Sequence, residues 1–136
     1  ELFDLAEQAL RPVIASHSNA YSVCPVSRNL RNGQIRRILD SKGLIGINLY
    51  KHFLRDGGNA VLSDVLRHID YFLTHGASHA LCLGCDMDGA ELPDELSDVS
   101  KLPRLAEEML KRNYPEKLIH AIFFENAHQF AMKNFI

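Results

Sequence analysis

The 136-residue chain lacks the features that mark nucleic-acid-binding, membrane-spanning or secreted proteins. Its formal net charge of −2 gives no electrostatic reason to expect nucleic acid or an anionic membrane as a partner. No apolar run approaches the ~20 residues that a transmembrane helix needs. The start, Glu1 to Asp4, is acidic and amphipathic, unlike a signal peptide. We therefore expect a cytoplasmic location and no membrane segment in this chain.

Cysteine is also scarce, and three cysteines, an odd number, exclude a complete disulfide framework. Cys82 and Cys85 form a C-x-x-C motif, but the second ligand pair that a zinc knuckle needs does not follow. A redox C-x-x-C normally lies at a helix N-terminus, whereas this one lies in an apolar run that ends at Asp86. We interpret both as core cysteines. A thiol redox domain remains an alternative, and a reactive cysteine of low pKa would support it.

Apolar periodicity predicts helices that alternate with strands. Strands are expected at Val13–Ser16, Leu44–Tyr50 and Ala80–Cys85. Helices are expected at Leu2–Leu10, Gly33–Leu39 (with Asn32 as N-cap), Leu62–Leu73, Pro103–Arg112 and from Pro115 onward, and a loop at His52–Asn59.

This order of elements builds a parallel sheet with right-handed crossovers. Three strands alone would leave two apolar edges unpaired, which is an aggregation hazard. The Gly-rich phosphate loop of doubly wound sheets is absent, and a closed β/α barrel needs eight strands and many more residues. The sequence therefore predicts an α/β fold, the C-terminal three β/α units of a TIM-type (β/α)8 barrel. Residues 1–136 would form a single partial domain, with an N-terminal part preceding Glu1.

Each predicted strand ends in polar side chains that can carry chemistry. His17 follows the first strand, Asn48 and Tyr50 end the second, and Asp86 ends the third. The C-terminal strand ends form the active-site mouth of a β/α barrel, so we expect His17, Asn48 and Asp86 to converge on one cavity. A neutral histidine can bind a metal ion, and an aspartate can transfer a proton. A hydrogen-bonded structural histidine remains an open interpretation of His17 alone.

Arg28 lies in the loop beside the first strand end, where a guanidinium can clamp a substrate carboxylate with two hydrogen bonds. Asp88 is interpreted as a turn residue before Gly89. His52 lies in a loop at the functional end of the sheet. The remaining histidines are interpreted as surface or hydrogen-bonded structural residues: His68, His75, His79, His120 and His128.

Several longer stretches surround these residues and match one known family in order and spacing. They are PVIASHSNAYSVCPVSRN (12–29), GLIGINLY (43–50), DVLRHIDY (64–71), GCDMDG (84–89), DVSKLP (98–103) and the closing IFFENAHQF (122–130). Together they resemble the membrane dipeptidase (renal dipeptidase) family of zinc peptidases, and they cover nearly the whole chain.

The resemblance implies an amidohydrolase-type barrel that hydrolyses dipeptides with two zinc ions bridged by a hydroxide. His17 would ligate one zinc ion, and Arg28 would bind the free carboxylate of the dipeptide. Asp86 would transfer the proton to the leaving nitrogen. Asn48 and Tyr50 are expected to line the substrate.

The family's H-x-D pair, its bridging glutamate and two further histidines belong upstream of Glu1. His17 and Asp86 cannot hold two zinc ions alone, because each ion needs several protein ligands. We therefore expect the isolated chain to be inactive until an N-terminal part of the barrel completes it, and a homodimer stays open. The alternative is a non-catalytic barrel fragment that serves as an assembly or binding piece.

Overall fold

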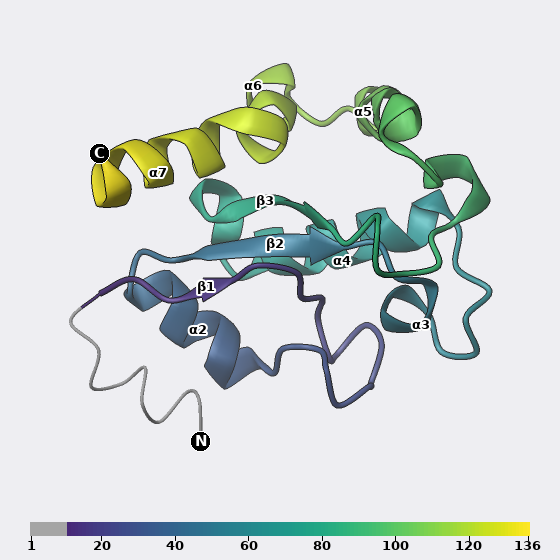
Figure 1. The fold of residues 1–136 in the computed structure, drawn as a ribbon, viewed down its shortest axis with the longest axis horizontal. Helices are drawn as coiled ribbons and strands as arrows, with labels where there is room; N and C mark the ends of the chain where they lie inside the picture. Colours follow the sequence, from purple (N-terminus) through teal and green to yellow (C-terminus); the bar gives the residue numbers. More distant parts are fainter. Residues whose placement is uncertain (1–10) are drawn as a thin grey trace.

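Three short parallel strands form the centre of the computed structural model, which describes residues 11–136. They are β1 (Ile14–Ala15), β2 (Leu44–Asn48) and β3 (Leu81–Cys85), in the order β1-β2-β3 (Figure 1). Ile14 pairs with Leu44, and Ile45 pairs with Leu81. The predicted parallel sheet is confirmed, while the helix predicted for Leu2–Leu10 lies outside the described residues.

The middle strand, β2, is buried at all of its positions, as expected for an almost continuously apolar segment with layers on both faces. One position in β2 and one in β3 have room only for glycine. A Cβ atom added to Gly46 or to Gly84 would lie 2.1 Å from the carbonyl oxygen of Ser16. The segment that follows β1 therefore lies directly over β2 and β3.

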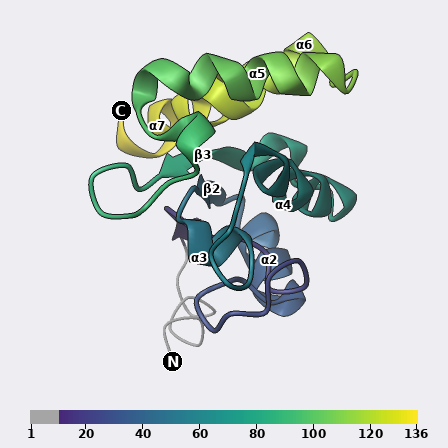
Figure 2. The same cartoon turned by 90° about the vertical axis from the view of Figure 1, so that its right-hand side faces the viewer.

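The helices surround this sheet. α2 (Asn32–Asp40) and α4 (Leu62–Thr74) follow β1 and β2, and α5 (Leu102–Lys111), α6 (Glu116–His120) and α7 (Asn126–Phe135) follow β3. A π-helical turn, Ala121–Glu125, joins α6 to α7. The helices α5 to α7 lie beyond β3, on the opposite side of the sheet from α2 (Figures 1 and 2). Within residues 11–136, no helix has both the length and the apolar character needed to cross a membrane.

The predicted apolar face of α4 is confirmed, because its residues Val65, Leu66, Ile69 and Phe72 are fully buried. The terminal helix buries Ile119 and Ile122 together with one polar residue, Asn126. The side-chain amide of Asn126 donates to the carbonyl oxygens of Ser78 at 2.9 Å and Leu81 at 2.8 Å. These bonds tie α7 to the start of β3.

Two local predictions were wrong. The loop expected at His52–Asn59 begins with a one-turn helix, α3 (Lys51–Leu54), which buries Leu54 completely. A single turn is too short to produce a periodic pattern in the sequence. Asn32 is the first residue of α2, and Arg31 occupies the N-cap position, where its N–H donates to the Gln34 side chain. The turn signal at Gly57 and Gly58 is confirmed by their φ angles of +80° and +76°.

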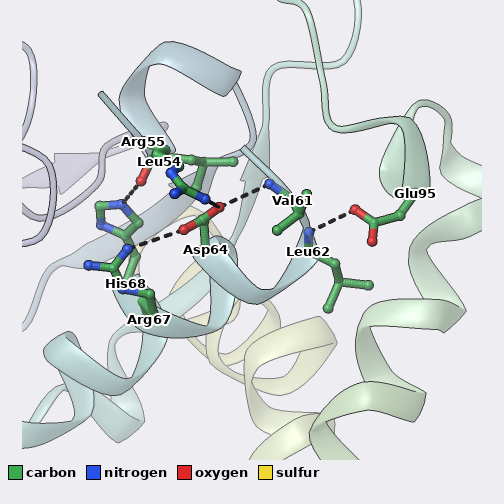
Figure 3. Close-up of polar contacts among 8 residues, drawn as sticks. All are labelled: Leu54, Arg55, Val61, Leu62, Asp64, Arg67, His68 and Glu95. Carbon is green, nitrogen blue, oxygen red and sulfur yellow. Dashed lines mark hydrogen bonds and ion pairs between the residues drawn. The ribbon is translucent and has the colours of Figure 1, made fainter. Parts of the chain in front are cut away.

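A buried carboxylate organises the start of α4 (Figure 3). Asp64 accepts the N–H of Val61 at 3.0 Å and is 3.2 Å from the guanidinium of Arg67 and 3.8 Å from that of Arg55. Glu95 accepts the neighbouring N–H of Leu62 at 2.9 Å. These bonds satisfy two N–H groups that have no partner within the helix, and they hold the end of α3 against α4.

We predict that Asp64→Ala lowers the free energy of unfolding by about 1–3 kcal/mol, because it removes the acceptor for Val61 and the charge that faces two arginines. Asp64→Asn keeps an acceptor at the same place and is expected to lose less. Urea denaturation of the two variants measures the difference. Equal losses would contradict a capping role for the side chain of Asp64.

Candidate functional site

His17 follows β1 after one residue, Ser16, and is half-buried. Its Nδ1 is 2.7 Å from the Ser16 hydroxyl, and its Nε2 is 3.2 Å from the guanidinium of Arg28. A guanidinium has only donors, so Nε2 must be the unprotonated acceptor and Nδ1 carries the proton. The Nε2 lone pair is the one that a metal ion would use, and here it faces Arg28.

The structure thus brings together two of the predicted site residues, His17 and Arg28. They line one cavity of about 340 Å³ beside β1, together with residues 13–16, 18, 27, 29, 30 and 34. Arg28 is exposed, so a carboxylate that enters this cavity can reach its guanidinium.

Asn48 links the ends of the three strands. Its side-chain amide lies 3.5 Å from the carbonyl oxygen of His17 and 3.4 Å from the carboxylate of Asp86. Its side-chain oxygen accepts the N–H of Tyr50 at 2.6 Å. His17, Asn48 and Asp86 therefore lie at the same end of the sheet, although Asn48 and Asp86 are outside the set of residues that lines the His17 cavity.

The end of β3 has an uncommon backbone conformation. Cys85 and Asp86 have φ angles of +24° and +63°, a region that residues with a side chain rarely adopt. A register shift between Ile47 and Asn48 of β2 accompanies it. Backbone strain of this kind persists where surrounding structure enforces it, and it is concentrated at functional sites. Asp88 lies in the following turn, as predicted.

Tyr50 is placed differently from the other candidates. Its ring packs against His52 and Phe53, with ring centroids 5.2 and 4.8 Å away. Its backbone, through the bond to Asn48, is the part that contacts the site.

The described residues do not form a complete metal site, because no group of three or more His, Cys, Asp or Glu side chains among residues 11–136 is arranged to hold an ion. His17 offers one suitable nitrogen, and Asp86 offers a carboxylate. Cys82 and Cys85 are half-buried free thiols. Burial raises the pKa of Cys82 to about 11 and also raises that of Cys85, the reverse of what a reactive thiol needs.

Sequence reasoning missed the buried polar residues that hold the His17 loop, residues 16–30. Asn19 and Asn48 form a reciprocal pair, since Asn19 donates to the Asn48 carbonyl at 2.9 Å and accepts its N–H at 3.1 Å. Asn29 donates to the carbonyls of Cys24 and Phe53, both at 2.9 Å. His68 was interpreted as either a surface residue or a hydrogen-bonded structural residue, and it is fully buried. Spacing alone gives no signal for such contacts.

We predict that Asn19→Ala lowers the free energy of unfolding by about 2–4 kcal/mol, because it leaves the buried N–H and carbonyl of Asn48 without partners. The exposed Asn134→Ala serves as the control and should change it by less than about 0.5 kcal/mol. Urea denaturation of both variants measures this. Equal effects would show that the reciprocal pair contributes nothing.

Burial lowers the pKa of His68 to about 4, below the ordinary value of 6.5 that the unfolded chain retains. Between these values the unfolded state binds a proton that the folded state does not, so stability falls as pH drops from 6.5 to 4. The loss should reach about 3 kcal/mol, with no contribution from His68 above pH 6.5. Unfolding measured from pH 4 to 7 should show this slope in the wild type and a smaller one in His68→Gln; identical slopes would contradict it.

The comparisons with known proteins agree on one family. A family model described as membrane dipeptidase (peptidase family M19) matches residues 2–133. An uncharacterized protein in the pqqA 5' region of Klebsiella pneumoniae is 39% identical over 91% of this chain and 47% of its own length. Dipeptidase aclJ of Aspergillus oryzae is 38% identical over 74% of this chain and 25% of its own length.

Solved structures match the fold closely. A metallo peptidase from Rhodobacter sphaeroides, liganded with a phosphinate mimic of the dipeptide L-Ala-D-Ala, has a TM-score of 0.92 and 33% identity over 98% of this chain and 39% of its own. The dipeptidase AC, a metallo peptidase of family M19, has a TM-score of 0.89 and 34% identity over 94% of this chain and 38% of its own.

The two solved relatives are TIM-type barrels, and this chain spans about two-fifths of the length of each. The predicted fold, three β/α units of such a barrel, is therefore confirmed. The match of the family model over almost the entire sequence, with the motifs around His17 and Asp86 included, shows that the chain belongs to the membrane dipeptidase family, peptidase family M19.

Proposed function

We propose that this chain supplies part of the barrel and of the active site of a zinc-dependent dipeptidase. The observation that carries the proposal is the pairing of His17 with Arg28 in one cavity at the strand ends. One residue offers a metal-binding nitrogen, and the other offers a planar cation for a carboxylate. Membership of the dipeptidase family and the dipeptide mimic bound by the Rhodobacter sphaeroides relative support the same substrate class.

Arg28 is proposed to bind the free carboxylate of the dipeptide, because its guanidinium can form two parallel hydrogen bonds to it. The carboxylate then replaces His17 as the partner of Arg28, which frees the Nε2 lone pair. That exchange suits a residue that must present neutral imidazole nitrogen to a metal ion.

Zinc, when bound, supplies Lewis-acid polarisation of the peptide carbonyl and an activated water. Two ions are what the family resemblance implies, with ligands besides His17 coming from other parts of the barrel. Asp86 is proposed to transfer the proton to the leaving nitrogen. The side-chain amide of Asn48 lies 3.4 Å from the Asp86 carboxylate and is proposed to orient it. Asn48 and Tyr50 are proposed to border the substrate.

The partners that this proposal requires are a dipeptide and the remaining N-terminal part of the barrel; a homodimer is compatible with it. The alternative is a non-catalytic barrel fragment that serves as an assembly or binding piece, and the metal content and dipeptide hydrolysis of the complete protein distinguish the two. We expect the isolated 136-residue chain to be inactive and the complete protein to hydrolyse dipeptides.

In the complete protein, Arg28→Lys should raise KM for a simple dipeptide at least about tenfold, because a point charge cannot replace two directed bonds. Asp86→Asn should lower kcat by at least about a hundredfold while changing KM less. Steady-state kinetics together with the zinc content of each variant measure both effects.

Matched controls lie nearby. Arg36→Lys changes an exposed arginine of α2, and Asp88→Asn changes an exposed carboxylate two residues after Asp86. Both should keep wild-type kinetics. Wild-type kinetics for Arg28→Lys and Asp86→Asn as well, or the absence of metal and turnover from the complete wild-type protein, would contradict the proposed function.

A further inference from the structure

His68 connects α4 to two segments that are far from it in the sequence. Its Nδ1 accepts the N–H of Ala20 at 3.1 Å. Its Nε2 lies 2.9 Å from the carbonyl oxygen of Leu54, a contact that Figure 3 shows. A backbone N–H can only donate and a carbonyl can only accept. The ring is therefore neutral, with its proton on Nε2, and both of its nitrogens are occupied.

Ala20 lies in the His17 loop, three residues after His17. The loop closes on itself, because the N–H of Tyr21 donates to the Leu30 carbonyl and the N–H of Leu30 donates to the Asn19 carbonyl. The hydrogen bond from Ala20 to His68 therefore fixes both the part of the loop that carries His17 and the part that carries Arg28. The fully buried Ala20 cannot find water as a substitute partner.

The second hydrogen bond of His68 reaches the last turn of α3. Asn29, which follows Arg28, bonds the Phe53 carbonyl, and His68 bonds the next carbonyl, that of Leu54. Both carbonyls lie at a helix end, where they lack partners within the helix. The loop and α4 thus meet on α3, and Asp64 fixes α3 against α4 through Arg55.

We propose that His68 is a positioning residue: its neutral imidazole holds the His17 loop on α3 so that Arg28 stands beside His17, and it thereby sets the affinity for the substrate carboxylate without touching the substrate. This inference rests on the proposed function of Arg28. It also makes the geometry conditional on a neutral ring, because a proton on Nδ1 would face the N–H of Ala20 with a second donor. The charged groups that act on the ring are Arg67 and Asp64 on α4, and Arg55, after α3, lies 3.8 Å from the Asp64 carboxylate.

Three variants of the complete protein test the inference. His68→Leu removes both hydrogen bonds, and His68→Gln retains one acceptor and one donor but cannot be protonated in this range. Phe72→Leu reduces packing on the same helix, one turn away, and leaves both hydrogen bonds of His68 intact. It is the control for a general loss of stability. KM and kcat for a dipeptide, and amide hydrogen exchange of residues 16–30, are measured for each.

We expect His68→Leu to raise KM about tenfold or more, with a smaller change in kcat and with faster exchange confined to residues 16–30. His68→Gln should recover KM to within about threefold of the wild type, and Phe72→Leu should keep the wild-type KM. Equal increases of KM in His68→Leu and Phe72→Leu, or unchanged exchange of the loop in His68→Leu, would overturn the inference.

Two further outcomes keep the test decisive. If His68→Leu does not fold, the comparison moves to pH: KM of the wild type should rise on the acid side more steeply than that of His68→Gln, and superimposable profiles would overturn the inference. If the wild-type protein hydrolyses no dipeptide, the proposed function fails. The exchange of residues 16–30 then shows separately whether His68 holds the loop.

Discussion

Backbone groups that are buried where strands end must find hydrogen-bond partners, and this requirement shapes the functional end of the molecule. β2 is buried along its whole length, so the loops that cross its end cannot rely on water. Asn19, Asn29 and His68 fill this role from inside the protein, each bonding main-chain groups of another segment. The path of the loop is therefore fixed by buried polar side chains in addition to the apolar packing of Ala20 and Leu30.

The candidate site is a consequence of that fixed path. His17 emerges at the end of β1, and the loop returns so that Arg28 stands against its Nε2. Asn48 then connects the His17 carbonyl to the Asp86 carboxylate, which the left-handed backbone at the end of β3 presents. Each strand contributes one group to the same end of the sheet, as parallel β/α units do.

The fold was predictable because its signals are local and repeated. The apolar run of β2 and the stripe along α4 each have a period that one type of element explains, and their alternation leads to a parallel sheet. Polar residues after each strand indicated where the site would lie, and the motifs around them indicated the family. The single turn α3 carries no period, so it was predicted as a loop. The contacts of Asn19 and His68 join residues up to 48 positions apart, and no spacing rule encodes them.

We propose that His17 and Arg28 exchange their mutual contact for a metal ion and a substrate carboxylate when both bind. A crystal structure of the complete protein with zinc and a phosphinate dipeptide mimic tests this most directly. We expect Nε2 of His17 to bind the metal and the guanidinium of Arg28 to lie on the carboxylate of the mimic. A structure in which His17 and Arg28 remain paired while the metal and the mimic bind elsewhere would contradict it.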